Sequence, residues 1–398
     1  MSAPGSAGHP DRATTMRVLY AIEGLGTGGT ERSLAEMLPP LTAAGVEPEV
    51  VCLFRREGCH AAVEAAGAPV TVLDAHGWTG RLRELRRHLG ERQPDLVHTM
   101  LFRTDLLGRL AAAGTGVPVL GSLVGTPYAP TRLRDPRIDP RRLGLARRAD
   151  SWTARRLCRH FHAVSRTVAE AAVRDLGLPP ERITVVPRGR DPRRLGSPSP
   201  RRRARSRERL GLGDDERVVV TAGRHEFQKG QLDLVEAIAR LADRGRTLLL
   251  IAGREGTLTP ELRSAAAPLG DRVRLLGHRD DLPEILAAAD LFAFPSLYEG
   301  MPGAVIEAMA LGLPVVASDI PPVREVVEPG VSALLVPPGE PGSLAAAIDA
   351  MLADRERASA AGRRGREIFE GRFTLERSVR GMLDLYRRQL EPIAAGGG

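Results

Sequence analysis

Two short stretches in the second half of the chain combine charged side chains with glycines. In "GRHEFQKG", residues 223–230, Arg224 and Lys229 follow a β-rich run that ends at Gly223. In open α/β sheets, ligands usually bind in the crevice at the carboxyl ends of the strands. A single exposed cation there would mean little, but two cations flanked by glycines suit a diphosphate.

Two carboxylates, Glu299 and Glu307, lie eight residues apart in the second stretch, "LYEGMPGAVIEAMALG". The first is in a Gly/Pro loop and the second is about one turn into a predicted helix. Backbone amides of Met301, Gly303 and Ala304 can bind phosphate oxygens, and a helix N-terminus favours anions by ~0.3–1 kcal/mol. A carboxylate at this end can accept hydrogen bonds from sugar or ribose hydroxyls. From the spacing alone, two solvated helix-end charges remain the more frequent explanation.

Glycines also follow the first β-rich run of the chain. Gly24, Gly26 and Gly29 satisfy the G-x-G-x-x-G pattern of dinucleotide-binding loops. A NAD site needs an acidic residue after the second strand, where this chain has Arg55 and Arg56, and no nicotinamide-side chemistry follows. The backbone of such a loop can hold a diphosphate without NAD, and a plain βα turn is the alternative.

The elements that position these residues alternate between β-rich and helical segments in two series. The first series covers residues 16–187 and the second 210–373, and residues 188–209, rich in Pro, Ser and Arg, interrupt the rhythm. A long amphipathic pattern over 374–391 closes the chain and is expected to return to the N-terminal domain. The pattern predicts two Rossmann-like, doubly wound parallel-sheet domains joined by a linker.

Composition limits the classes of protein and partner. The 398 residues carry a net charge of +8, almost all of it from Arg, which fits nucleotides, anionic lipid or nucleic acid, or only a genomic preference for Arg. Cys52, Cys59 and Cys158 form no C-x-x-C pair, so we expect no zinc site and a cytoplasmic location. No apolar run reaches the length of a membrane span. Residues 1–15 lack the apolar centre of a signal peptide and are predicted to be a disordered tail.

Several motifs in a fixed order resemble the retaining glycosyltransferases of family 4, which have the GT-B fold of two domains facing a central cleft. The motifs are "GGTER", "VPRGRD", "GRHEFQKG" and the Glu299–Glu307 pair, and the resemblance covers nearly all of residues 16–390. It implies a hexosyltransferase that moves a sugar from a nucleotide-diphosphate sugar to an acceptor hydroxyl with an α-type linkage. A UDP-sugar is favoured, with a GDP-sugar as the alternative, and neither cofactor nor metal is expected. The acceptor, a glycan, lipid or small metabolite, is not identified.

The resemblance also implies a role for each residue. Arg224 and Lys229 would neutralise the donor diphosphate, Glu307 would hold the ribose, and Glu299 would contact sugar hydroxyls. The remaining predicted donor contacts are Gly28 and Gly29 from the N-terminal domain, with Arg279, Gly300, Met301, Gly303 and Ala304 from the C-terminal domain.

The chain departs from the family pattern on the acceptor side. Many members carry a His after the strand that here reads "VLGSLVG", whereas this chain has no His between His98 and His160. His98, in "DLVHTM", is the candidate to replace it, and is counted with Glu299, Arg224 and Lys229 as a predicted catalytic residue.

Three other functions remain open. A nucleotide-sugar epimerase would share the nucleotide site but need no acceptor. A non-enzymatic protein could bind anionic polymers through its Arg-rich segments, although no nucleic-acid-binding module is recognised, so we expect no nucleic acid partner. A catalytically silent scaffold is the third.

The basic residues 131–160, with hydrophobic anchors near Trp152 and Leu157, are expected to meet an anionic acceptor or the inner membrane face.

Overall fold

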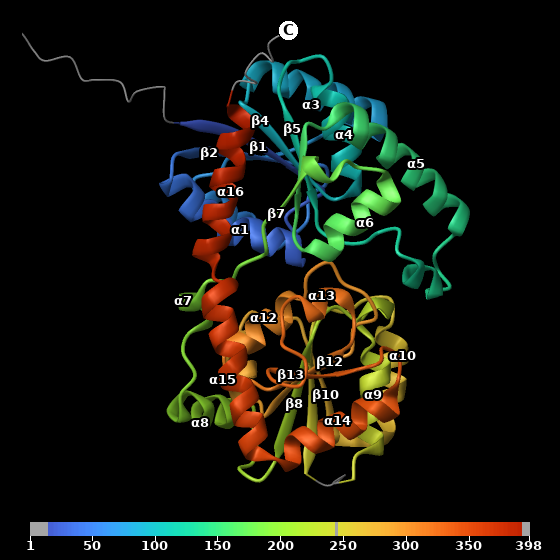
Figure 1. Ribbon diagram of the computed structural model, residues 1–398, viewed down its shortest axis with the longest axis vertical. Coiled ribbons are helices and arrows are strands. Elements are labelled where there is room, and N and C mark those ends of the chain that lie inside the picture. The colour runs from blue at the N-terminus through green and yellow to red at the C-terminus, as the bar shows by residue number, and fades with distance from the viewer. Residues whose placement is uncertain (1–14, 243–245, 392–398) are drawn as a thin grey trace, which may run out of the picture. The chain divides into compact units, whose positions relative to one another are not determined.

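The computed structural model describes residues 15–242 and 246–391 (Figure 1). The predicted tail, residues 1–15, lies outside this part of the chain except for its last residue. The described residues form two compact units. The first contains residues 15–122, 156–160 and 383–391, and the second contains 123–155 and 161–382.

Seven strands build the first sheet, in the order β3-β2-β1-β4-β5-β6-β7. The strands are β1 (Met16–Ile22), β2 (Val46–Cys52), β3 (Val70–Val72), β4 (Leu96–Met100), β5 (Val119–Leu123), β6 (His160–Ala163) and β7 (Ile183–Val185). The connecting helices are α1 (Gly29–Ala43), α2 (His60–Ala65), α3 (Gly77–Arg92), α4 (Phe102–Ala112), α5 (Pro140–Leu157) and α6 (Arg166–Leu176), with 3₁₀ turns η1 (Pro130–Arg134) and η2 (Pro180–Arg182).

Six strands build the second sheet, in the order β10-β9-β8-β11-β12-β13. They are β8 (Arg217–Ala222), β9 (Thr247–Ala252), β10 (Val273–Gly277), β11 (Leu291–Phe294), β12 (Val315–Ser318) and β13 (Ala333–Val336). The helices are α7 (Pro192–Leu195), α8 (Pro200–Arg209), α9 (Gln231–Arg240), α10 (Thr259–Ala266), α11 (Leu282–Ala288), α12 (Gly303–Ala310), α13 (Pro321–Arg324), α14 (Pro341–Ala353), α15 (Arg355–Arg372) and α16 (Leu375–Leu390), with turns η3 (Phe227–Lys229) and η4 (Ala267–Arg272).

Both sheets have the parallel, doubly wound topology that the sequence predicts. Every residue of β4, β9, β11 and β12 is buried. These strands are therefore continuous apolar runs with few polar residues, as expected when both faces of a parallel sheet are covered. The chain reverses its direction of winding between β1 and β4 and again between β8 and β11. Ligand crevices in this fold class form at such switch points.

The Arg-rich segment predicted as a linker, residues 188–209, contains α7 and α8. Arginines of α8 pack against α11 and the residues after it: Arg202 pairs with Glu284 at 2.9 Å, and Arg203 pairs with Asp290 at 2.8 Å. Much of this positive charge is therefore used within the protein. None of the helices among the described residues is both long and apolar enough to cross a membrane.

The loops after β8 and β9 approach so closely that a glycine is required between them. A Cβ atom at Gly253 would overlap the carbonyl oxygen of Gly223. We expect Gly253→Ala to lower the free energy of unfolding by about 1–3 kcal/mol, the usual effect of overpacking. Gly90→Ala is the control, because Gly90 lies in α3 and a Cβ atom added there would have no neighbour within 4 Å. Urea unfolding measures the stability of both variants. Equal midpoints for Gly253→Ala and Gly90→Ala would contradict the prediction.

Candidate functional site

The loops that follow β8 and β11 are joined to each other, because the two strands are paired in the sheet. The amide of Leu297 donates to the carbonyl of Gln228 at 2.8 Å, and the side-chain amide of Gln228 donates to the carbonyl of Tyr298 at 2.8 Å. Gly230 has a φ of +60°, and a Cβ there would overlap the carbonyl of Pro295. Only glycine allows this approach.

The joined loops bring two predicted site residues into contact. Nζ of Lys229 lies 2.5 Å from Oε1 of Glu299, and Glu299 is only 8% exposed. The ammonium also lies 5.6 Å from the ring centroid of Phe294. Lys229 is the single lysine among the 57 basic residues Lys and Arg of the chain, a signal that could have strengthened its prediction from sequence.

Arg224 stands in the same loop but has a different environment. Its side chain is exposed, and it has no ion-pair partner among residues 15–242 and 246–391. The loop therefore presents one paired and one unpaired cation beside a buried carboxylate. An anion is the natural ligand for the unpaired guanidinium.

The second predicted carboxylate, Glu307 of α12, is buried in an ion pair that the sequence analysis did not anticipate. Nε of Arg190 donates to Oε1 of Glu307 at 2.6 Å, and both side chains are at most 7% exposed. Arg194 lies 3.7 Å from the same oxygen. Gly303 makes room for this pair, because a Cβ there would overlap the guanidinium of Arg190. The sequence signal that could have identified Arg190 is its position in "VPRGRD", the stretch that directly follows β7.

Glu307 keeps one oxygen for a ligand. Oε1 accepts from Arg190, whereas Oε2 has no hydrogen-bond partner in the described part of the chain. The pairing therefore fixes the orientation of the carboxylate and still leaves an acceptor for a hydroxyl.

The loop between Glu299 and α12 supplies backbone donors. The carbonyl of Gly300 accepts from the hydroxyl of Ser165 at 2.8 Å, and the amide of Gly303 donates to the carbonyl of Met301 at 3.0 Å. The amides of Met301 and Ala304 donate to no residue that the structure describes. These two amides fit the predicted role of binding phosphate oxygens or sugar hydroxyls.

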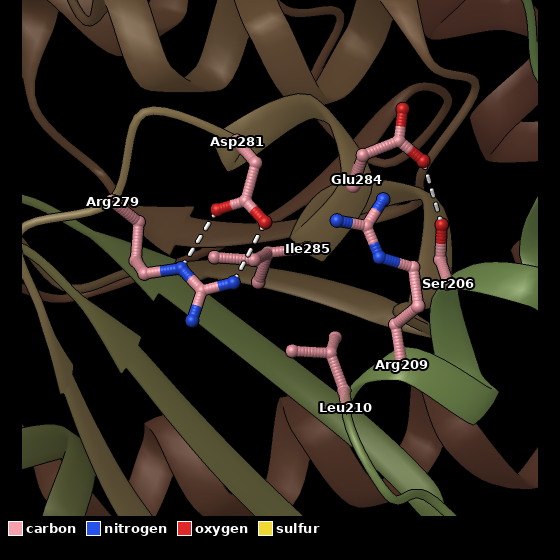
Figure 2. Close-up of a pocket in the computed structure, with 7 residues that line it drawn as sticks. All are labelled: Ser206, Arg209, Leu210, Arg279, Asp281, Glu284 and Ile285. Atoms are coloured by element: carbon pink, nitrogen blue, oxygen red, sulfur yellow. Dashed lines mark hydrogen bonds and ion pairs between the residues drawn. The ribbon is translucent and has the colours of Figure 1, made fainter.

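Arg279, predicted to contact the donor, is engaged elsewhere (Figure 2). Its Nε and Nη2 atoms donate to the two carboxylate oxygens of Asp281, each at 2.7 Å. These hydrogen bonds hold the pKa of Asp281 below its usual value. The pair lines a small hollow of about 90 Å³ beside α8 and α11, and no contact links Arg279 to Lys229 or Glu299 among the described residues.

His98 lies in a buried polar network of the first unit. It is 1% exposed, and its Nδ1 and Nε2 atoms form hydrogen bonds with the hydroxyls of Tyr386, at 2.8 Å, and Ser122, at 2.7 Å. The Tyr386 hydroxyl in turn donates to that of Tyr20 at 3.1 Å. Because both ring nitrogens are occupied inside the core, the geometry assigns His98 to anchoring α16 on β4 and gives no support to its predicted catalytic role.

The glycine loop of the first unit contains a carboxylate that the sequence analysis did not single out. Gly28 is the N-cap of α1, which starts at Gly29, and the side chain of Glu31 folds back over Gly28. A Cβ at Gly28 would overlap Oε2 of Glu31, a residue that is 8% exposed as a whole. A diphosphate that approached Gly28 and Gly29 as predicted would meet this negative charge.

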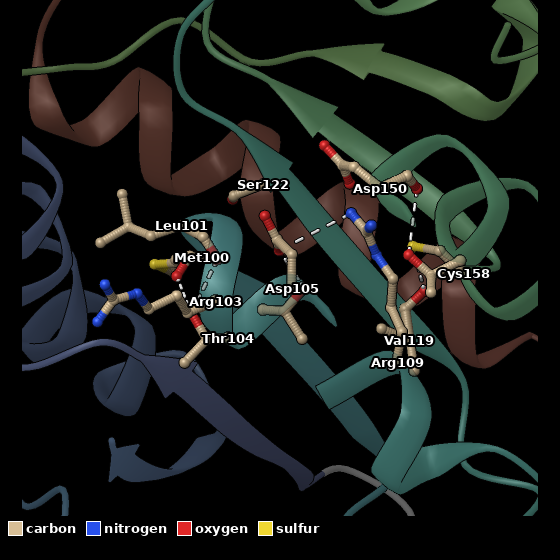
Figure 3. A network of polar contacts seen from close by, with 12 residues as sticks. Met100, Leu101, Arg103, Thr104, Asp105, Arg109, Val119, Ser122, Asp150 and Cys158 are labelled. Atoms are coloured by element: carbon tan, nitrogen blue, oxygen red, sulfur yellow. Dashed lines mark hydrogen bonds and ion pairs between the residues drawn. The ribbon is translucent and has the colours of Figure 1, made fainter. Parts of the chain in front are cut away.

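A second buried polar cluster lies at the end of β4 (Figure 3). The hydroxyl of Thr99 donates to Asp105 at 2.6 Å, and the buried Arg109 lies 3.9 Å from the same carboxylate. Leu101, between β4 and α4, has a φ of +77°, unusual for a residue with a side chain. The amide of Arg103 donates to Glu23 at 3.4 Å, so α4 begins beside the glycine loop.

No group of three or more His, Cys, Asp or Glu side chains that could hold a metal ion occurs in the described ranges. The carboxylates of the site instead have cationic partners: Lys229 for Glu299 and Arg190 for Glu307.

Comparisons with known proteins show the family of the chain. Residues 27–194 match the family described as Glycosyltransferase Family 4, and residues 202–368 match Glycosyl transferases group 1. The chain is 30% identical over 303 residues to the 2-deoxystreptamine glucosyltransferase of Streptomyces kanamyceticus, covering 73% of this chain and 78% of the relative. It is 32% identical over 246 residues to the UDP-Gal:alpha-D-GlcNAc-diphosphoundecaprenol alpha-1,3-galactosyltransferase of Escherichia coli, covering 60% of this chain and 61% of the relative.

A solved structure shares the fold. Anabaena Alr3699/HepE, in complex with UDP and glucose, superimposes with a TM-score of 0.83 at 24% identity, covering 94% of this chain and 99% of that one.

The buried ion pair between Arg190 and Glu307 is expected to be costly to break from one side. Arg190→Met leaves the carboxylate of Glu307 without its main partner, and we expect the free energy of unfolding to fall by roughly 3–5 kcal/mol. The double variant Arg190→Met/Glu307→Gln removes both charges and is expected to recover part of this loss. Urea unfolding of the wild type, Arg190→Met, Glu307→Gln and the double variant gives the coupling, and strictly additive losses would show that the two side chains do not interact.

Proposed function

The chain belongs to glycosyltransferase family 4, and from this premise we propose that it transfers a sugar from a nucleoside-diphosphate donor, preferentially a UDP-sugar, to an acceptor hydroxyl. The observation that carries the proposal is the contact between Lys229 and Glu299 beside the unpaired Arg224, at a switch point of the second sheet. Relatives and structural neighbours with UDP or UDP-Gal in their names support the choice of base. A screen of UDP-, GDP- and ADP-sugars for nucleotide release tests it.

The donor diphosphate binds between the two cations. Arg224 can bind a phosphate oxygen directly, because it has no ion-pair partner among the described residues. Lys229 must exchange the carboxylate of Glu299 for a phosphate oxygen. Glu299 is then free to accept hydrogen bonds from hydroxyls of the donor sugar. Cations held in place before the reaction stabilise the charge that develops on the leaving group, and this electrostatic effect is usually the largest contribution to catalysis.

The ribose of the donor binds at Glu307. Its Oε2 atom accepts from a ribose hydroxyl, and Arg190 keeps the carboxylate in one orientation through Oε1. The amides of Met301 and Ala304 add hydrogen bonds to the same ligand.

Transfer proceeds with retention and forms an α linkage, without a metal ion. The acceptor hydroxyl attacks from the face of the leaving group, and the departing phosphate takes its proton. Such a mechanism needs no histidine on the acceptor side, which agrees with the burial of His98. Proton NMR of the anomeric centre in the product distinguishes retention from inversion. An epimerase or a silent scaffold would release no nucleotide in response to an acceptor.

The helix α5 is proposed to place the protein on an anionic membrane at its cytoplasmic face. Its exposed residues Arg141, Leu145, Arg148, Trp152 and Arg155 are spaced by three or four positions and so lie on one face. Leu145 is 65% exposed and Trp152 is 52% exposed. A helix face that combines arginines with large apolar side chains is typical of segments that lie in the membrane interface.

Loss of either donor cation is expected to weaken donor binding. A hydrogen bond to a charged group contributes about 1.5–3 kcal/mol, so Arg224→Ala and Lys229→Ala should each raise the Kd for UDP roughly ten- to a hundredfold. Arg377→Ala is the control, because Arg377 is an exposed arginine of α16 without an ion-pair partner among the described residues. Calorimetry with a chelator present measures the affinities. Unchanged Kd values in both variants would show that the donor diphosphate does not bind at this loop.

Membrane binding is expected to depend on charge and on salt. The wild-type protein should float with liposomes that contain anionic lipid and not with neutral ones, and binding should weaken with salt, which screens the attraction. Arg141→Glu/Arg148→Glu and Trp152→Ala should each reduce flotation, whereas Arg377→Glu should not. Absence of salt-sensitive flotation of the wild-type protein would exclude the membrane contact.

A further inference from the structure

His225 is a buried histidine in the loop that follows β8, next to the exposed Arg224. It is 1% exposed, and its Nδ1 atom forms a hydrogen bond with the hydroxyl of Thr259, in α10, at 3.0 Å. Its Nε2 atom is also buried and has no hydrogen-bond partner among the residues that the structure describes. A buried polar atom without a partner is uncommon in a folded protein, so this imidazole requires an explanation beyond packing.

Main-chain hydrogen bonds join the same residue to the loop that follows β9. The amide of His225 donates to the carbonyl of Arg254 at 3.2 Å, and the carbonyl of His225 accepts from the amide of Leu258 at 3.0 Å. A Cβ atom at Gly256 would lie 2.5 Å from the carbonyl oxygen of His225, so a side chain there would displace it. The backbone and the side chain of His225 therefore both connect the loop after β8 to the loop after β9 and to α10.

The pocket around His225 fits a neutral imidazole. The hydroxyl of Thr259 is held in place, because it accepts from the amide of Gly256 at 2.9 Å. In either tautomer, one ring nitrogen forms the bond to Thr259 and the other stays enclosed without a partner among the described residues. An imidazolium has two N–H donors, and the donor on Nε2 would meet no acceptor in this position.

The charged side chains that act on His225 come from three segments. Glu226 belongs to the same loop, Glu255 to the loop after β9, and Arg263 to α10. Burial has the largest effect and lowers the pKa of the His225 imidazole below its usual value of 6.5, whereas the two carboxylates raise this pKa and Arg263 lowers it. Both carboxylates have partners already, since Glu255 pairs with Arg263 and Glu226 accepts from the hydroxyl of Thr257 at 2.5 Å. A protonated His225 is therefore better accommodated outside its buried position.

A displacement of His225 would move the two cations that are proposed to bind the donor diphosphate. Arg224 precedes it in the chain, and the carbonyl of Arg224 accepts from the amide of Glu226 at 2.8 Å. The carbonyl of Glu226 accepts in turn from the amide of Lys229 at 2.9 Å. Because main-chain hydrogen bonds connect these residues, the position of the imidazole determines the position of the loop.

We propose that His225 is a positioning residue for the donor diphosphate: the neutral imidazole, bound to Thr259, holds the loop with Arg224 in the form that binds, and protonation of His225 releases this loop. The inference rests on the proposed function, because that function assigns the diphosphate to this loop. Donor binding is expected to weaken as the pH falls below 6.5 toward the lowered pKa of His225. In that range the unfolded chain binds a proton that the folded pocket excludes, so the stability contributed by the neutral imidazole is lost there as well.

The test measures the Kd for UDP by calorimetry in the full-length chain, at about pH 7.5 and at a lower pH, about 5 to 6, at which circular dichroism shows every protein to be folded. His225→Asn supplies an amide that can bond to Thr259 but does not titrate, and His76→Asn, the control, removes an exposed histidine of the first unit. Protonation of the UDP phosphate is common to all three proteins, so the comparison isolates His225. On acidification, the Kd of wild type and of His76→Asn is expected to rise roughly three- to tenfold more than that of His225→Asn.

Two results separate the inference from the proposed function. Equal pH dependence in wild type and His225→Asn overturns the inference, even where UDP binds normally at both pH values. Failure of UDP and of every nucleotide sugar to bind the wild type at the higher pH instead overturns the proposed function.

Thr259→Val distinguishes positioning from a purely structural role. The hydroxyl that fixes the imidazole is lost while the size of the side chain is kept, and Thr259 lies outside the loop that carries Arg224. We expect this variant to raise the Kd for UDP and the KM for the donor roughly two- to tenfold, the effect of one lost hydrogen bond, and to change kcat at saturating donor less. A lower melting temperature with unchanged Kd and KM would show that the contact serves only the fold and would count against the inference.

Discussion

Parallel pairing of the strands is the constraint on which the site depends. In each sheet all carboxyl ends meet at one edge, so every loop from a strand to the next helix emerges there. Because β8 and β11 are neighbours, the loops that follow them touch, and Lys229 contacts Glu299 across 70 positions of sequence. The same pairing of β1 with β4 places Glu23, after β1, beside the start of α4.

Glycines allow charged side chains to fold against the backbone at these edges. Gly223 leaves room for the stem of Lys229, Gly303 for the guanidinium of Arg190 and Gly28 for the carboxylate of Glu31. Two carboxylates of the second unit are thereby paired with cations, whereas Arg224 and Glu31 have no charged partner among the described residues. An unpaired cation suits a phosphate, so Arg224 corresponds to the donor diphosphate of the proposed transfer.

The fold and the position of the charged loops at the sheet edge were accessible from sequence because their signals are local. Apolar runs of strand length alternating with helical periods predict two parallel sheets, and the structure has seven and six parallel-ordered strands. The charged motifs "GRHEFQKG" and "LYEGMPGAVIE" follow such runs directly, so their position at the sheet edge also follows from sequence. Arg279 was assigned by resemblance alone, and its side chain binds Asp281, only two residues away.

What the sequence determined by itself is therefore the architecture, the family and the order of the charged loops, since each is written in residues close together along the chain. Tertiary structure decided which charged side chains form ion pairs and which have no partner among the described residues. Only the packed core shows that His98 is enclosed between Tyr386 and Ser122, that Arg190 holds Glu307, and that Glu31 has no partner among the described residues. The physical reason is that burial and ion pairing depend on neighbours far apart in sequence, and no spacing rule reports them.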